Sequence, residues 1–222
     1  RTRRRAVAVS STAMDLSRLS VEAWSALWSR LGARNDAGPL HAAVLTRYGE
    51  AHRAYHTAEH IARILPLLDG VRARLREPDE AELALWLHDL VYDPRGADNE
   101  ARSAAIAAEW LTAGGAPAER GERVRALIMA TRHAAPPDEH DARYVVDADL
   151  SILGAAPPEF DRYETQVRRE YAFVPEAEWR TRRAALLRRF LAQPRLFLTE
   201  EFGRFEGPAR ANLARSCARL EE

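Results

Sequence analysis

The sequence predicts an all-α protein built as a single helical bundle. Apolar residues recur at helical spacing over most of the chain, for example across residues 16–31 and 61–75. Proline and glycine interrupt this pattern at intervals and divide the chain into about nine helical segments. No run of alternating polar and apolar residues indicates a β-sheet.

The expected helix boundaries follow the chain in order. They fall at residues 32–39, 77–78, 94–96, 114–117, 136–137, 157–158, 175, 194 and 207–208. The segment 81–87 carries apolar residues on every side, which is typical of a helix at the centre of a bundle. His88 and Asp89 would then end a buried helix. The segments after Pro158 are expected to be amphipathic helices that pack on this centre.

Length and composition favour one domain. The chain has 222 residues, of which 46% are hydrophobic, enough for a sizeable core. Residues 1–13 are rich in arginine and contain no methionine, so we expect a disordered or non-native extension there. Residues 14–222, beginning at Met14, would form the single helical domain.

The charge balance and the cysteine count exclude several classes of protein. The 33 basic and 33 acidic residues cancel, so we expect no nucleic-acid partner. No stretch reaches the roughly 18 apolar residues of a membrane span, so no membrane partner is expected either. Cys217 is the single cysteine, which excludes an internal disulfide and fits a cytoplasmic location. Apolar surfaces permit a homodimer without requiring one. Because every basic residue is arginine, mechanisms that need a lysine are also excluded.

Three histidines recur every four residues, at His52, His56 and His60. If a helix begins at Tyr55, His56 and His60 share one of its faces about one turn apart. Such spacing suits metal or proton chemistry. The alternative for each histidine is a surface position or a hydrogen-bonded place in the core.

The adjacent pair His88-Asp89 places two polar groups at the end of an apolar helix, where unpaired polar groups are unfavourable. A divalent cation would compensate them, and the donor types suit Mn, Fe, Zn, Co or Ni, with Mg favoured where carboxylates dominate. The alternative is a buried hydrogen bond within the pair.

Further along, Asp147 and Asp149 would point apart on a helix, so one is expected to face the histidines. The other would be a helix cap or an arginine partner.

A histidine, then a His-Asp pair, then a distant aspartate resembles the order of metal ligands in the HD superfamily of metal-dependent phosphohydrolases. The resemblance rests on four stretches: RAYHTAEHI (53–61), LALWLHDLVYDP (83–94), DNEARSA (98–104) and DADLSILG (147–154). It extends to RREYAFVP (168–175) and ARANL (209–213) and is closest to an uncharacterised bacterial branch. It implies an HD-type helical bundle.

The resemblance also implies roles for individual residues. The expected metal ligands are His60, His88, Asp89 and Asp149. Asp149 is preferred to Asp147 because, in related ADxL elements, the last aspartate directly precedes a short leucine-containing stretch. The stretch YHTAEH is similar to an element of cyclic-nucleotide phosphodiesterases in which the first histidine, here His56, protonates the leaving oxygen.

Five further residues are candidates for the substrate pocket or for the catalytic machinery. Arg53 and Arg132 would bind phosphate oxygens, since guanidinium offers paired donors. His133 is expected near the phosphate and Arg169 on the pocket wall. Glu100 would orient a ligand histidine or a water. The alternative is that Glu100 is an acidic residue at a helix N-terminus, where it interacts with the helix dipole.

The predicted function is hydrolysis of a small phosphorylated metabolite, such as a nucleotide, by water that a divalent metal ion activates. Asp89 or Asp149 would accept the proton of that water. Two alternatives remain: a di-iron oxygenase of the HD type, which would need extra ligands such as His133, and a non-catalytic metal-stabilised module that binds a nucleotide or a protein. His140 is expected to be an exposed loop residue.

Overall fold

The computed structural model describes residues 16–222 and is all-helical, as predicted. Residues 1–13, for which an extension is expected, lie outside the described part. The ten α-helices are α1 (Val21–Arg30), α2 (Gly38–Tyr48), α3 (Ala58–Gly70), α4 (Pro78–Leu87), α5 (Asn99–Ala113), α6 (Ala118–Ala130), α7 (His140–Leu150), α8 (Pro157–Glu170), α9 (Glu176–Leu191) and α10 (Glu206–Glu221). Short 3-10 helices are η1 (Ser17–Leu19), η2 (Arg72–Arg74), η3 (Ser151–Gly154) and η4 (Gly203–Phe205).

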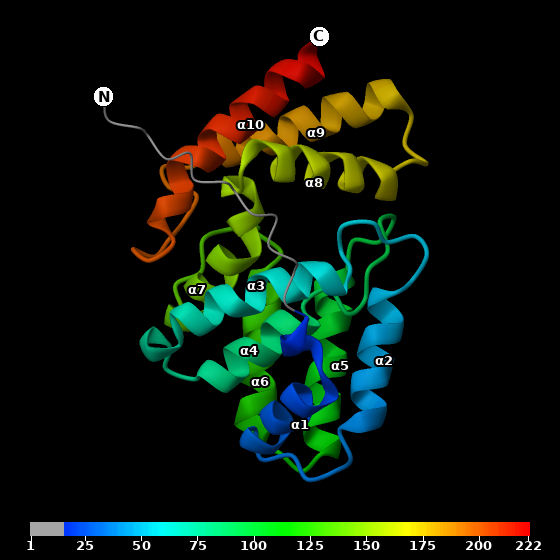
Figure 1. The fold of residues 1–222 in the computed structure, drawn as a ribbon, viewed down its shortest axis with the longest axis vertical. Helices are drawn as coiled ribbons and strands as arrows, with labels where there is room; N and C mark the ends of the chain where they lie inside the picture. The colour runs from blue at the N-terminus through cyan, green and yellow to red at the C-terminus, as the bar shows by residue number, and fades with distance from the viewer. Residues whose placement is uncertain (1–15) are drawn as a thin grey trace, which may run out of the picture.

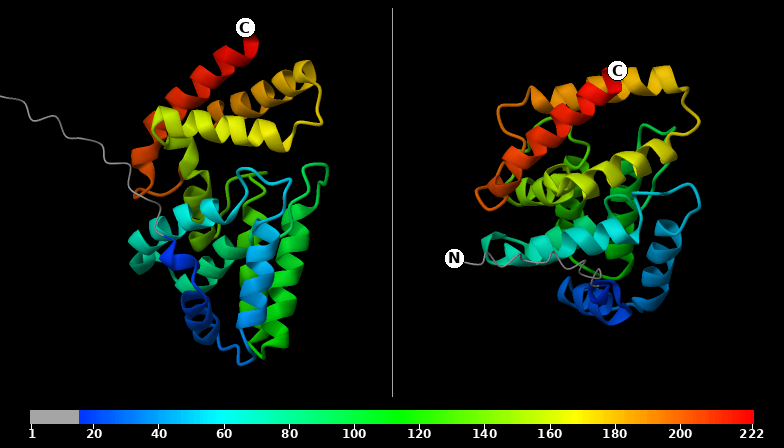
Figure 2. Two further views of the ribbon diagram at one scale, coloured as in Figure 1. Left: turned by 45° about the vertical axis from the view of Figure 1, so that its right-hand side comes forward. Right: turned by 45° about the horizontal axis from the view of Figure 1, so that its top comes forward.

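The helices form a bundle of α1 to α7 and a layer of α8, α9 and α10 that lies across one end of it (Figure 1). Both views in Figure 2 keep this layer on the same side of the bundle. Helix α5 packs along α6, and α10 packs along α9 and on η3. The continuous apolar core includes residues from Trp24 to Cys217, so it extends through both parts.

Helix α4 lies at the centre of the bundle, as its composition predicts, and packs against α1, α3, α5, α6 and α7. Its buried side chains include two carboxylates, Glu80 and Glu82, which are exposed by only 1% and 3%. Each is neutralised by guanidinium groups. Glu80 accepts two hydrogen bonds from Arg123, and Glu82 is paired with Arg18, Arg30 and Arg72. Buried charges in a central helix are tolerated because opposite charges surround them.

Gly154 anchors the C-terminal layer on the bundle at η3. A Cβ atom at this position would lie 2.7 Å from the backbone oxygen of Phe205, closer than real Cβ contacts allow. From α10, the Asn212 amide donates hydrogen bonds to the carbonyl oxygens of Leu153 and Ala155. The absence of a side chain at Gly154 therefore lets the two layers approach each other.

Across residues 16–222, no helix is both long enough and apolar enough to cross a membrane.

Candidate metal centre

Four side chains converge where α3, the end of α4 and α7 meet. The Nε2 atoms of His60 and His88 lie 3.3 Å apart, and Asp149 Oδ1 lies 3.1 Å from the first and 3.4 Å from the second. Asp89 Oδ2 lies 3.0 Å from His88 Nε2 and 4.0 Å from His60 Nε2. Ligands at about 2.1 Å from one ion, in tetrahedral or octahedral arrangement, are about 3.0 to 3.5 Å from one another. The spacing of the donors of His60, His88 and Asp149 fits a metal ion, and Asp89 lies beside His88 as a fourth candidate ligand.

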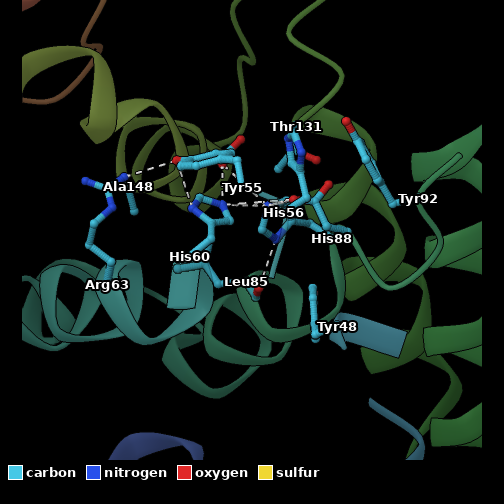
Figure 3. A network of polar contacts seen from close by, with 12 residues as sticks. Tyr48, Tyr55, His56, His60, Arg63, Leu85, His88, Tyr92, Thr131 and Ala148 are labelled. Atoms are coloured by element: carbon cyan, nitrogen blue, oxygen red, sulfur yellow. Dashed lines mark hydrogen bonds and ion pairs between the residues drawn. The ribbon is translucent and has the colours of Figure 1, made fainter. Parts of the chain in front are cut away.

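The imidazole rings are held with one nitrogen turned into the cluster. His88 Nδ1 lies 2.9 Å from the carbonyl oxygen of Leu85, so Nδ1 carries the proton it donates and neutral His88 presents an Nε2 lone pair. His60 Nδ1 contacts the Tyr55 hydroxyl at 3.0 Å (Figure 3). Both rings are thus oriented through Nδ1, the arrangement that metal-binding histidines require.

The electrostatics of the cluster favour positive charge. Burial raises the pKa of Asp149, but His88 and hydrogen bonds from three histidines outweigh it and hold the pKa well below its usual range. Burial lowers the pKa of His88, but Asp89 and Asp149 outweigh this effect and raise it well above the usual value. The two carboxylates thus favour a positive charge beside them, which the proton of His88 supplies in the metal-free protein and which a divalent cation would supply in its place.

Of the two aspartates on α7, the structure brings Asp149 to the histidines and turns Asp147 away. Asp147 is fully buried and accepts hydrogen bonds from the backbone N–H groups of Leu198 and Thr199 and from the Thr199 hydroxyl. Asp147 therefore holds the loop after α9 instead of capping its own helix or pairing with an arginine.

His56 lies in the loop before α3, and the expectation that it shares a helix face with His60 is wrong. Thr57 has extended backbone angles, and α3 begins only at Ala58. His56 nevertheless lies near the metal cluster, since its ring centroid is 6.4 Å from that of His60. Its ring also stacks on Tyr92, with centroids 4.2 Å apart (Figure 3).

Glu170, at the end of α8, holds His56 in place and was not singled out from the sequence. Its Oε1 accepts hydrogen bonds from the backbone N–H groups of Ala54, Tyr55 and His56, at 2.7 to 3.0 Å. Its Oε2 contacts His56 Nδ1 at 2.7 Å and accepts from the Tyr92 hydroxyl at 2.8 Å. Burial raises the pKa of Glu170, but His56 and the backbone donors outweigh it and lower the pKa to about 2.

Arg53 has a different role from the phosphate binding expected of it. Its side chain is fully buried, and it donates hydrogen bonds to the Glu50 carboxylate and to the carbonyl oxygens of His56, Asp89 and Leu90. These bonds tie the loop that carries His56 to the loop that follows α4. Because the Arg53 guanidinium already donates to these acceptors, it is not available to a substrate, and the prediction that Arg53 binds phosphate is wrong.

A cavity of about 780 Å³ opens over the metal cluster, between the bundle and the C-terminal layer. Glu100, Arg132 and His133 line it, whereas Arg169 is exposed on α8 outside it, which corrects the expectation that Arg169 lines the pocket. Glu100 contacts neither ligand histidine among the described residues, and Tyr55 and Leu85 take the orienting role that was expected of it.

His133 joins the cluster from the loop after α6. Its Nε2 lies 2.9 Å from Asp149 Oδ2, the carboxylate oxygen that faces away from the two ligand histidines. Its backbone has a φ of 50°, a left-handed conformation that is uncommon for residues other than glycine. His140 lies far from this site, where its Nε2 contacts the carbonyl oxygen of Arg74.

Comparisons of the chain with protein-family models, with curated proteins and with solved structures find no match. The chemistry of the centre is therefore inferred from its own residues.

Proposed function

We propose that this protein is a metal-dependent phosphohydrolase of the HD type, which cleaves a phosphate ester or anhydride of a small metabolite. The observation that carries the proposal is the convergence of His60, His88 and Asp149 at spacing that fits one metal ion, with Asp89 beside His88, beneath a cavity. Two nitrogen and two oxygen donors suit Mn, Fe, Co, Ni or Zn, with Mg as a further candidate. Held there, such an ion would lower the pKa of water and neutralise phosphate charge.

His56 is the proposed proton donor to the leaving oxygen. Its Nδ1 is bound to Glu170, so Nε2 is left for the cavity that His56 lines. Burial lowers the pKa of His56, but Asp89 and Glu170 outweigh it and raise the pKa, which favours the protonated ring near neutral pH. A group that must donate a proton is thereby kept charged.

The reaction balances with the residues present. Water attacks phosphorus, forming one P–O bond as the bond to the leaving oxygen breaks. The proton of the water passes to Asp89, and the leaving oxygen takes a proton from His56. Arg132, exposed on the cavity wall, is retained as a cation that attracts the negative substrate. The volume of the cavity suits a nucleotide or a metabolite of similar size.

The test combines metal analysis with turnover. Protein purified without added metal should contain one equivalent of a divalent ion, and a panel of phosphorylated metabolites should release phosphate with Mn, Mg, Co or Ni. The variant His56→Gln should keep the metal and lose turnover about 100-fold or more. The matched control His140→Gln, whose ring is remote from the cavity, should change neither.

Three outcomes would contradict the proposal. Two irons per chain would favour the oxygenase, with His133 as an extra ligand. Metal without turnover of any compound would favour the non-catalytic binding module. Asp89→Ala with unchanged metal content would refute the ligand set.

A cytoplasmic location is proposed with the function, because the buried Cys217 is unpaired.

A further inference from the structure

Three arginines that line the cavity have no acidic partner among residues 16–222. One of them, Arg95, lies over the Phe173 ring at 3.8 Å from its centroid, and the other two are Arg132 and Arg189. Arg132 directly precedes His133, whose Nε2 lies 2.9 Å from Asp149 Oδ2. Arg189, on α9, directly precedes Phe190, whose ring lies 6.3 Å from that of His133. The two arginines therefore flank one contact between the bundle and the C-terminal layer. Both side chains are exposed and contact no carboxylate or carbonyl oxygen of residues 16–222.

Two other arginines that line the cavity, Arg182 and Arg183, have acidic partners. Arg183 is buried, paired with Glu164, and donates a hydrogen bond to the Tyr163 hydroxyl at 2.9 Å. Arg182, which also lines the cavity, forms an ion pair with Glu178 one turn earlier on α9. Arg132 and Arg189 are thus the cavity arginines that have neither an acidic nor an aromatic partner among the described residues, and their charge favours an anion in the cavity.

We propose that Arg132 and Arg189 form a subsite for a second phosphate group of the substrate. The proposal rests on the proposed function and narrows it, since the substrates become compounds with two phosphate groups, one at the metal cluster and one between the arginines. Phosphate suits this place because each planar guanidinium offers paired donors to its oxygens. An anion bound between the two walls would also join the bundle to α9 and close the cavity over the reacting phosphate.

Binding of non-hydrolysable probes tests the subsite without relying on turnover. Isothermal titration of the full chain loaded with Mn would compare propane-1,3-diyl bisphosphonate with propylphosphonate, which has the same carbon chain and one anionic group. The wild-type protein should bind the bisphosphonate about 10-fold more tightly. The bisphosphonate also chelates Mn, but to the same extent in every variant. A change in the ratio of the two affinities between variants therefore measures the contribution of the arginines.

The variants Arg132→Gln and Arg189→Gln should each reduce the affinity ratio severalfold, and Arg189→Lys should restore part of it. The control is Arg169→Gln, which removes an exposed, unpaired arginine of α8 outside the cavity and should leave the ratio unchanged. All three wild-type side chains are exposed, so the variants should fold.

Two results would overturn the subsite: an unchanged ratio in both cavity variants, or an equal loss in Arg169→Gln, which would indicate a general effect of charge. If the metal-loaded protein binds neither probe, the proposed phosphohydrolase function fails as well. If propylphosphonate binds as tightly as the bisphosphonate, only the subsite fails.

Discussion

Replacing Glu170 by glutamine removes the charge that holds the loop of the candidate acid, and its cost can be worked out from the structure. The carboxylate has no exposed surface and accepts five hydrogen bonds, so solvent does not screen it. In Glu170→Gln the amide oxygen can keep the three backbone donors. The amide nitrogen, however, would face the Nδ1 proton of His56, which needs an acceptor.

The magnitude follows from the pKa of Glu170, which falls from its usual 4.5 to about 2 in the folded protein. Each pKa unit corresponds to about 1.4 kcal/mol, so the charged form stabilises the fold by about 3 kcal/mol. Because the folded-state pKa is the lower one, this contribution is present above pH 4.5 and is lost as the pH falls toward 2. The raised pKa of His56 adds stability that is present below pH 6.5 and lost as the pH rises through the folded-state value.

Urea unfolding followed by tryptophan fluorescence, at equal metal content, measures both the size and the pH dependence. At pH 6 the free energy of unfolding of Glu170→Gln should lie about 3 kcal/mol below that of the wild type, and the difference should shrink between pH 5 and pH 2. The control Glu176→Gln removes an exposed partner of Arg168 and should change stability by less than about 0.5 kcal/mol. A difference below about 1 kcal/mol at pH 6, or one that is the same at pH 3, would refute the reasoning.

Four further substitutions test the metal ligands and the contacts that hold the loops and the layers. Asp147→Asn should reduce stability to urea and leave the metal content of dialysed protein unchanged, whereas Asp149→Asn should reduce the metal content; equal metal loss in both would contradict the ligand assignment. Arg53→Met should lower the free energy of unfolding by about 3 kcal/mol, because four buried hydrogen bonds are lost, and an unchanged urea midpoint would show that the loops do not depend on it. Gly154→Ala should cost about 2 kcal/mol in the same assay, since its Cβ would meet the backbone of Phe205, and a neutral result would mean that the layers adjust freely.

The sequence could predict the helical class and the centre of the bundle, because both depend on local patterns. Helical spacing of apolar residues recurs in nearly every segment, and the apolar run before His88 identifies the buried helix. A polar pair at the end of such a helix must find compensation, so His88 and Asp89 stand out without any knowledge of their partners. The sequence also contains a signal for the start of α3, because threonine favours the N-cap position and Thr57 as the cap places His56 outside the helix.

Contacts between distant segments could not be predicted from one sequence. Glu170 lies 114 residues from His56 along the chain and sits among arginines, so it looks like any acidic residue on a solvated helix. The role of Arg53 could not be predicted for another reason. A guanidinium that binds carbonyl oxygens and one that binds phosphate use the same donors, so the sequence does not tell them apart. Only burial and the identity of the acceptors separate the two roles.

These distant contacts make the C-terminal layer part of the centre and more than a cover for it. The bundle supplies the proposed metal ligands from α3, the end of α4 and α7, but Glu170 of α8 fixes the loop that presents His56. Arg189 of α9 faces the same cavity from the opposite wall. A substitution that loosens the layer at Gly154 should therefore impair the proton donor more than metal binding, because Glu170 belongs to the layer, whereas the proposed ligands belong to the bundle. The bundle therefore contributes the proposed metal ligands, and the C-terminal layer positions the proposed proton donor. Turnover should fall further than metal content when the contact between the two is weakened.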